Sequence, residues 1–255
     1  MYNSTQDTLI IGKKVIYLPS CHSTNDIAAE IVHAGLFDEG TVVITDNQLK
    51  GRGQRGTEWR VNPGENLTFS LILKPDFLPI QDQFLISQAV ALAVREYVSN
   101  YVQNAKVKWP NDILANGGKI CGTLIENSIQ GSKITSSLIG IGVNINQTNF
   151  ESKRATSLSV ETGKAYRLGE EFHKLLKLLD AFYLQLKSKT QQESLKTQYL
   201  HQLYGYGDKV KFIYEQEIVS GEVLHITPQG KIGVLLDGKN EPIDFGLKEI
   251  EWFRD

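Results

Sequence analysis

The sequence predicts an α+β fold in which helices flank a mixed or antiparallel sheet and a small β-barrel follows. Apolar runs typical of strands occupy residues 41–45, 67–73 and 138–146. Two longer runs, 80–102 and 168–187, repeat their apolar residues at helical spacing and predict helices that pack on the sheet. After Gly207 the pattern changes to short β-like runs separated by Gly, Pro, Asn and Asp, which is typical of a small barrel.

The change in pattern places a domain boundary near residue 206. We expect residues 1–206 to form the larger domain, with a further helix at 191–203, and residues 207–255 to form the barrel. The predicted barrel strands are 209–214, 218–226, 232–236, 242–245 and 249–253. A unit of this size has little core of its own, so it should dock on the larger domain.

Composition argues against several classes of protein. The chain has 255 residues, of which 41% are hydrophobic and 22% charged, and its net charge is −2. These values are typical of a globular protein without a nucleic-acid or membrane surface. The sequence shows no signal-peptide pattern and no apolar run of membrane-spanning length. Cys21 and Cys121 lack metal-type or redox spacing, so we expect reduced packing thiols in a cytoplasmic protein.

A glycine- and arginine-rich segment, GRGQRGTEWR at 51–60, follows the predicted strand 41–45. Glycines allow a backbone to approach a ligand closely, and arginine carries a permanent charge suited to carboxylate or phosphate. Residues 51–56 also match G-x-G-x-x-G, but a dinucleotide-binding turn needs a helix that starts within the motif. The breaker pair at 63–64 excludes that helix. Two interpretations remain, a solvated basic loop and a loop that closes over an anion.

Ser23, Thr24 and Asn25 precede an apolar run with helical spacing. Such side chains cap the free N–H groups of a helix start, and this capping role is one interpretation. The alternative is that their hydroxyl and amide groups face a cleft and bind a small polar ligand. Both interpretations are compatible with each other.

Lys119 and Asp112 face each other across a predicted hairpin. Pro110 ends the first strand, and the Asn-Gly-Gly turn at 116–118 starts the return strand. The pair is either a surface ion pair of little energetic value or part of a site. Gly122 in the middle of the return strand favours the second interpretation, because it allows a ligand or another backbone to come close.

The run at 138–146, LIGIGVNIN, has one apolar face and an opposite face of glycine and asparagine. Solvent-facing strand positions usually carry Thr, Lys or Glu instead. We interpret the Gly140, Gly142 and Asn144 face as the floor of a ligand site, with a solvated face as the alternative.

With these segments placed, the sequence resembles the biotin–protein ligases, which attach biotin to lysines of carrier proteins. The matching motifs, in the family's order, are Ser23-Thr24-Asn25, GRGQRG at 51–56 with Trp59, KWPND at 108–112, GKICG at 118–122 and GIGVNIN at 140–146. The resemblance covers essentially the whole chain. It implies a class II synthetase-like catalytic domain over residues 1–206, with a small C-terminal SH3-like β-barrel over 207–255.

The resemblance also implies the residues of the site. Biotin contacts are implied at Ser23, Thr24, Asn25, Gln48, Gly51, Arg52, Gly53, Gln54, Lys119, Gly122 and Gly142. ATP contacts are implied at Arg52, Arg55, Trp59, Asn111, Lys119 and Asn144. We expect Arg52, Arg55 and Lys119 to neutralise the two reacting anions. We expect Asp112 to act as general base toward the acceptor amine or to orient it.

The implied reaction activates biotin with ATP and Mg²⁺ as biotinyl-5′-AMP and then transfers it to a lysine. The implied partner is a biotin carboxyl carrier protein of acetyl-CoA carboxylase or a related carboxylase. No nucleic-acid or membrane partner is expected. A monofunctional ligase without an N-terminal DNA-binding domain is expected. The sequence does not fix the oligomeric state, and a homodimer is compatible with it.

Two positions depart from the family pattern, because relatives often have Arg at the position of Gln54 and an acidic residue at that of His22. The first departure bears on how well the adenylate is retained. Two alternative functions stay open. One is a lipoate–protein ligase, which shares the fold and the acyl-adenylate chemistry. The other is a non-catalytic adenylate-binding protein that docks a carrier.

Overall fold

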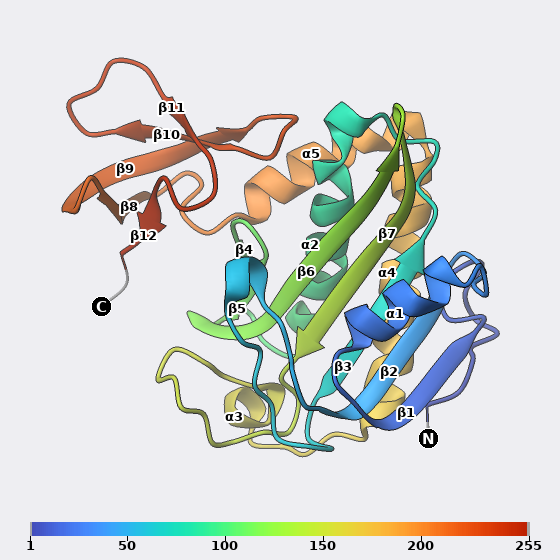
Figure 1. Cartoon of the computed structure of the whole chain (residues 1–255). Helices are drawn as coiled ribbons and strands as arrows, with labels where there is room; N and C mark the ends of the chain where they lie inside the picture. Colours follow the sequence, from blue (N-terminus) through green and yellow to red (C-terminus); the bar gives the residue numbers. More distant parts are fainter. Residues whose placement is uncertain (1, 254–255) are drawn as a thin grey trace.

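The structure is a computed structural model that describes residues 2–253, with the exception of the Arg55 side chain, and it contains two β-sheets (Figure 1). The larger sheet has seven strands in the order β1-β2-β3-β7-β6-β5-β4. Their bounds are β1 Val15–Cys21, β2 Thr41–Gln48, β3 Leu67–Leu73, β4 Ala105–Lys108, β5 Asp112–Ala115, β6 Gly118–Gln130 and β7 Lys133–Val143. Strands β1 and β2 pair in parallel and the other neighbours are antiparallel. The predicted mixed sheet is therefore confirmed.

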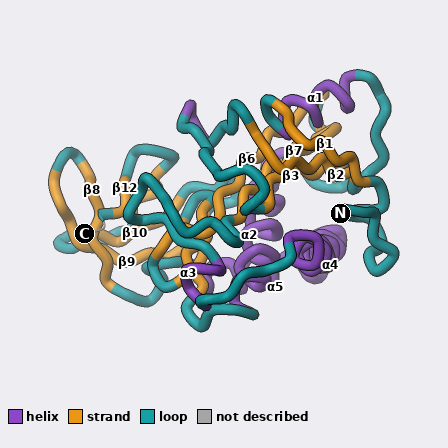
Figure 2. Tube along the Cα trace, turned by 90° about the horizontal axis from the view of Figure 1, so that it is seen from below, coloured by secondary structure: helices purple, strands orange, loops and turns teal. Residues whose placement is uncertain are grey.

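Helices cover both faces of this sheet, as Figure 2 shows from below. Helices α2 (Phe84–Ser99), α4 (Leu168–Lys187) and α5 (Lys189–Gln202) pack together on one face. Helix α1 (Thr24–His33) lies on the other face, over β2, β3 and β7. Side chains alternate along β2, so the strand contributes to the packing on both faces of the sheet. Val42 and Ile44 belong to the main core, while Val43 packs toward α1 on the other face.

Several predicted elements differ in their bounds from the structure, two of them by three or more residues at both ends. The predicted helix 80–102 begins with a separate 3₁₀ turn, η2 (Ile80–Asp82), before α2 starts. The predicted strand 138–146 starts earlier and ends at Val143, so Asn144 lies beyond the strand. Two further short elements are the 3₁₀ turn η1 (Gln54–Gly56) and helix α3 (Leu158–Thr162).

The C-terminal sheet is antiparallel, with the order β11-β10-β9-β8-β12. Its strands are β8 Lys209–Tyr214, β9 Glu217–Ile226, β10 Ile232–Leu236, β11 Ile243–Phe245 and β12 Glu251–Trp252. In the described part of the chain no ladder joins β11 to β12, so the predicted small barrel is an open antiparallel sheet and not a closed barrel. The domain boundary near residue 206, between α5 and β8, remains our proposal.

Two tryptophans join the C-terminal sheet to the end of β4. The Trp109 indole N–H donates to the Gly230 carbonyl at 2.9 Å, and the Trp252 indole N–H donates to the Trp109 carbonyl at 3.0 Å. The Tyr204 backbone N–H donates to the Val107 carbonyl at 2.8 Å on the same side. Buried indole N–H groups need such partners, so these bonds fix the seam between the sheets.

Within residues 2–253, none of the helices combines the length and the apolar character that crossing a bilayer requires.

Candidate functional site

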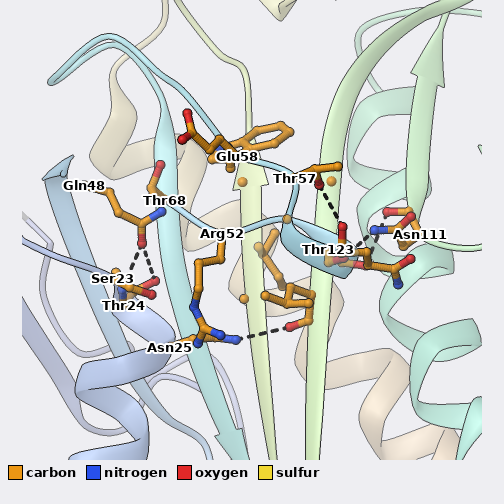
Figure 3. A pocket seen from close by; sticks show the side chains of 18 of the residues that line it. Ser23, Thr24, Asn25, Gln48, Arg52, Thr57, Glu58, Thr68, Asn111 and Thr123 are labelled. Atoms are coloured by element: carbon orange, nitrogen blue, oxygen red, sulfur yellow. Dashed lines mark hydrogen bonds between the residues drawn. The ribbon is translucent and has the colours of Figure 1, made fainter. Parts of the chain in front are cut away.

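Two adjoining cavities lie against the glycine loop, the name we give to residues 51–60. The first cavity, of about 240 Å³, lies between α1, the glycine loop and strands β3, β6 and β7 (Figure 3). The predicted residues that line it are Ser23, Thr24, Asn25, Gln48, Arg52, Gly53, Gln54, Trp59, Asn111, Asp112, Lys119, Gly122 and Gly142. Five segments far apart in the sequence thus meet here, as the motifs predicted.

The second cavity is larger, about 1080 Å³, and it has walls on both sheets. Lys108, Asn144 and Arg154 line it from the larger sheet and its loops, and Lys248 and Trp252 from the C-terminal part. The residues shared with the first cavity are Gln54, Thr57, Glu58, Trp59, Asp112 and Lys119. The two spaces therefore meet at Trp59 and at the Asp112–Lys119 pair.

Polar groups gather at the α1 end of the first cavity. The Ser23 hydroxyl caps α1 by accepting from the Asp26 backbone N–H. The Thr24 backbone N–H and hydroxyl donate to Gln48 Oε1 at 2.8 and 3.2 Å, which leaves the Gln48 amide nitrogen as a donor. Figure 3 shows Ser23, Thr24 and Gln48 together at this end. The capping and cavity-lining interpretations of Ser23 and Thr24 both hold.

Ser70 supports this network from below, and the sequence analysis did not single it out. It is fully buried on β3, and its hydroxyl oxygen lies 2.8 Å from Thr24 Oγ1 and 2.6 Å from Asn25 Oδ1. The available signal was a lone hydroxyl in the apolar run LTFSLIL. A buried hydroxyl without such partners would be costly, so Ser70 holds both neighbours in place.

Glycines form the floor, and close contacts explain why. A Cβ at Gly140 would lie 2.7 Å from Asn25 Oδ1, and one at Gly142 would lie 2.3 Å from Trp59 Cε2. Gly122 pairs with Gly142 across β6 and β7, and a Cβ there would lie 3.0 Å from Trp59 Cζ3. The glycine face is thus covered by the Asn25 amide and the Trp59 indole and does not face solvent.

Asn144 has a different place from the one predicted. It lies past the end of β7, and its side chain donates to the Thr156 carbonyl at 2.9 Å. It lines the second cavity and not the floor of the first. Asn111 is also held, because its amide donates to the Thr123 carbonyl at 2.7 Å.

The glycine loop is a tight hairpin without the helix of a dinucleotide-binding turn. The Trp59 backbone N–H donates to the Gly51 carbonyl at 3.0 Å, and the Gly53 N–H donates to the Thr57 carbonyl at 2.6 Å. Gly51 is buried by this pairing and does not line the first cavity. Among the described residues the Trp59 indole N–H is a buried donor without a partner. Such a donor is available to a ligand.

The Arg52 side chain contacts two carboxylates that the sequence analysis missed. Arg52 Nη2 lies 2.6 Å from Asp26 Oδ1, and Arg52 Nη1 lies 3.2 Å from Glu126 Oε1. We had expected Arg52 to face a carboxylate and a phosphate of the ligands. The Arg55 side chain lies outside the described part of the chain.

Asp112 and Lys119 form a half-enclosed ion pair. Lys119 Nζ lies 2.7 Å from Asp112 Oδ1, and Lys108 Nζ lies 3.2 Å from Asp112 Oδ2. Asp112 is only 8% exposed, so the interpretation as a surface ion pair is wrong. Removing one partner of such a pair leaves a poorly solvated charge behind.

A β-bulge on β6 brings Lys119 into this position. Ile113 pairs with Cys121, whereas Leu114 pairs with Lys119, so Ile120 is the extra residue. Ile120 and Cys121 are consecutive, and both are fully buried. The bulge therefore reverses the alternation and places Lys119 on the cavity face together with Gly122.

The ion pairs in and next to the first cavity are unevenly distributed, since Asp26, Glu126 and Lys108 contact its lining residues without lining it themselves. At the α1 end, one guanidinium is matched with two carboxylates, those of Asp26 and Glu126. At the other end, two ammonium groups, Lys108 and Lys119, share the single carboxylate of Asp112. A ligand with a neutral polar head and an anionic tail fits this distribution, with its tail near Lys119.

The cysteines take no part in the site. Both are free and buried. Burial raises the pKa of the Cys121 thiol, and also that of Cys21, above the ordinary value of 9.0. Such thiols are poor nucleophiles, which supports the interpretation as packing residues.

Known proteins with similar sequences show to which family this chain belongs. Residues 17–144 match the model of the biotin/lipoate A/B protein ligase family, which is about half of the chain. The chain belongs to this family. The bifunctional ligase/repressor BirA of Bacillus spizizenii is 36% identical over 176 residues, which make up 66% of this chain and 54% of that protein. The chain thus spans about half the length of this relative.

Two further relatives of the biotin/lipoate ligase family cover more of the chain. The biotin–[acetyl-CoA-carboxylase] ligase of Mycobacterium tuberculosis is 27% identical over 88% of this chain and 84% of that protein. The structure of a biotin protein ligase from Aquifex aeolicus in complex with biotin and ATP is 26% identical, with a TM-score of 0.77 over 95% of this chain and 100% of that chain. The likeness extends over the C-terminal sheet, and the predicted fold class is confirmed.

Proposed function

We propose that this chain is an ATP-dependent ligase that activates biotin as biotinyl-5′-AMP and transfers it to a lysine of a biotin carboxyl carrier protein. The observation that carries the proposal is the charge distribution of the first cavity. Its α1 end, where two carboxylates outnumber one guanidinium, is polar and suits an uncharged ring, and its Lys119 end suits a carboxylate. Family membership and the relatives' names support the same activity.

Biotin would bind with its ureido ring among the groups at the α1 end. Gln48 offers an amide donor there, and the hydroxyls of Ser23 and Thr24 can both donate and accept. This polar end favours biotin over lipoate, because the dithiolane ring of lipoate has no strong hydrogen-bonding group. The lipoate alternative is therefore the weaker one.

ATP would occupy the second cavity, with its α-phosphate near the boundary between the two cavities. In the first step a biotin carboxylate oxygen attacks the α-phosphorus, the bond to the β-phosphate oxygen breaks, and pyrophosphate leaves. The step brings two anions together, so fixed positive charge stabilises its transition state. Lys119 lines both cavities and is the described cation best placed for this role.

Mg²⁺ would enter with ATP. In the part of the chain that the structure describes, no group of three or more His, Cys, Asp or Glu side chains is arranged to hold a metal ion. Mg²⁺ keeps several waters and is commonly bound through substrate phosphates, so we derive no step from a metal held by the protein.

In the second step the neutral amine of a carrier lysine attacks the acyl carbon of the adenylate. The acyl–phosphate bond breaks, AMP leaves, and the new amide nitrogen loses a proton. Both oxygens of Asp112 already accept from ammonium groups. Orientation of the amine thus fits Asp112 better than proton abstraction does.

Transfer of labelled biotin to a biotin carboxyl carrier domain, with and without ATP, tests the proposal. We expect ATP-dependent labelling of the carrier lysine, pyrophosphate release before carrier is added, and no labelling with lipoate. A cytoplasmic setting, which supplies ATP and keeps Cys21 and Cys121 reduced, fits the proposal. Binding of biotin and ATP without pyrophosphate release would instead support the non-catalytic adenylate-binding alternative.

A further inference from the structure

Asp26 and Glu126 hold the Arg52 guanidinium from two sides. Arg52 Nη2 lies 2.6 Å from Asp26 Oδ1, and the two Nη atoms lie 3.2 and 3.3 Å from Glu126 Oε1 and Oε2. Asp26 belongs to the first turn of α1, Glu126 to the middle of β6 and Arg52 to the glycine loop. One side chain therefore joins three elements around the mouth of the first cavity.

Glu126 has a second partner inside the cavity wall. Its Oε2 accepts from Asn25 Nδ2 at 2.7 Å, while Asn25 Oδ1 accepts from the Ser70 hydroxyl at 2.6 Å. These two bonds fix which end of the Asn25 amide faces which way. Glu126 thus holds a residue of the cavity wall and the anchor of the glycine loop with the same carboxylate.

Arg52 is the tether of the glycine loop. Over residues 51–58, it is the one described side chain with a hydrogen bond to α1 or β6. Other bonds of this segment, such as that between Thr57 and Gln54, stay within the loop. Because two carboxylates already more than offset the Arg52 charge, an anionic ligand gains little from this arginine, and the main effect of Arg52 is on the position of the loop.

We propose that Glu126 is a positioning residue for the ring end of biotin, an inference that rests on the proposed function. Glu126 fixes the Asn25 amide and, together with Asp26, tethers the glycine loop through Arg52. The polar end of the cavity and the position of the loop are therefore coupled through one carboxylate. Asp26 affects the loop alone, because no bond of its side chain to the cavity wall is found among the described residues.

Three variants separate these effects. Glu126→Ala removes the acceptor of Asn25 and one partner of Arg52, and Glu126→Gln keeps an acceptor for Asn25. Asp26→Asn weakens the Arg52 contact and the longer contact with His22, at 3.7 Å, but among the described residues it touches no part of the cavity wall other than Arg52. Glu30→Gln is the matched control, since Glu30 is an exposed acid on the same helix whose nearest basic partner is His22 at 4.0 Å. Hydrogen exchange of residues 51–60 without ligand and calorimetric biotin binding are measured for each.

We expect faster exchange across residues 51–60 in all three variants and wild-type exchange in Glu30→Gln. Biotin Kd should rise about 10- to 100-fold in Glu126→Ala, the cost of losing a charged hydrogen bond. It should rise less than about fivefold in Asp26→Asn, as for an exposed ion pair. Glu126→Gln should lie nearer to wild type than Glu126→Ala does. The KM for ATP should stay unchanged, which a general structural defect would not allow.

Unchanged loop exchange in Glu126→Gln and Asp26→Asn would overturn the tether, and wild-type biotin affinity in Glu126→Ala would overturn the positioning role. If Glu126→Ala does not fold, Glu126→Gln and Asp26→Asn still test the tether through exchange. A wild-type protein that binds no biotin would refute the proposed function instead, and the exchange of the ligand-free loop would still test the tether.

Discussion

Asp112 Oδ1 and Lys119 Nζ lie 2.7 Å apart across the β5–β6 hairpin, at the boundary between the two cavities. The pair is shielded, and Lys108 supplies the second ammonium at 3.2 Å. One carboxylate thus fixes the positions of two cations without cancelling their combined charge. The boundary between the cavities keeps a net positive charge where the two anions of the proposed reaction would meet.

The first prediction concerns Lys119. Lys119→Ala should lower the rate of adenylate formation about 100- to 1000-fold, because it removes a fixed charge from the transition state. It should also weaken biotin binding. Pyrophosphate release under single-turnover conditions measures the first effect. Lys106→Ala on the neighbouring β4 is the control, since Lys106 lines neither cavity. Wild-type adenylate yield and biotin affinity in Lys119→Ala would remove this lysine from the site.

The second prediction separates the two half-reactions. Asp112→Asn keeps the shape of the side chain and removes its charge, so the positions of Lys108 and Lys119 loosen while their charges remain. Adenylate formation should survive, whereas transfer from preformed adenylate to the carrier should slow. Quench-flow of each half-reaction measures the two rates. Equal losses in both would show that Asp112 serves the charge arrangement and has no role toward the amine.

The third prediction tests Ser70. Ser70→Ala leaves Asn25 Oδ1 without its buried donor, which costs about 1–3 kcal/mol in the free energy of unfolding. It should also weaken biotin binding, because Thr24 and Asn25 lose their common support. Ser137→Ala is the matched control, as Ser137 is equally buried on β7 but donates to Asn127. We expect both variants to destabilise the fold to a similar extent. Only Ser70→Ala should lose biotin affinity.

The fourth prediction concerns the seam between the sheets. Trp252→Phe removes the hydrogen bond to the Trp109 carbonyl and one polar group from the wall of the second cavity. ATP affinity should fall while biotin affinity stays near wild type. Calorimetry with each ligand measures the contrast. Tyr214→Phe, in β8 of the same sheet and outside the cavity lining, should change neither affinity.

The fifth prediction follows from the buried thiols. Because burial raises the pKa of Cys121 and of Cys21, both stay protonated in the folded protein at pH 8. Alkylation by iodoacetamide should be slower than in the unfolded chain, because burial disfavours the reactive thiolate. The unfolded chain loses these protons at a lower pH than the folded one, so the free energy of unfolding should fall as the pH rises through the ordinary thiol pKa. Rapid alkylation of native Cys121 would contradict this.

The sequence predicted the elements and the meeting of the motifs, but not the contacts that cross between them. Periodicity and turn signals located the strands and the main helices, because these depend on neighbouring residues. The Arg52 ion pairs with Asp26 and Glu126 join positions 26 and 74 residues apart, which local pattern does not encode. Only the fold brings them together.

The position of Lys119 also could not be predicted from the local sequence pattern, although it depends on residues close to it in the chain. Simple alternation along the return strand would place Lys119 and Gly122 on opposite faces. The bulge at Ile120 puts them on one face, and no glycine or proline marks it in the sequence. Only the expected place of Asn144 on the cavity floor was wrong, because the predicted strand extended three residues too far at its C-terminal end and the alternation was carried past Val143; its ATP contact stays a prediction.

The seam formed by Trp109 and Trp252 has a consequence for turnover. The larger cavity has one wall on each sheet, so a nucleotide held there makes its contacts across the junction between the two sheets. A more rigid junction between the two sheets would slow the dissociation of ATP. It would also slow the release of AMP, because AMP would make the same contacts. Substitutions that reinforce the junction should therefore lower the KM for ATP and, where AMP release limits the cycle, lower kcat as well.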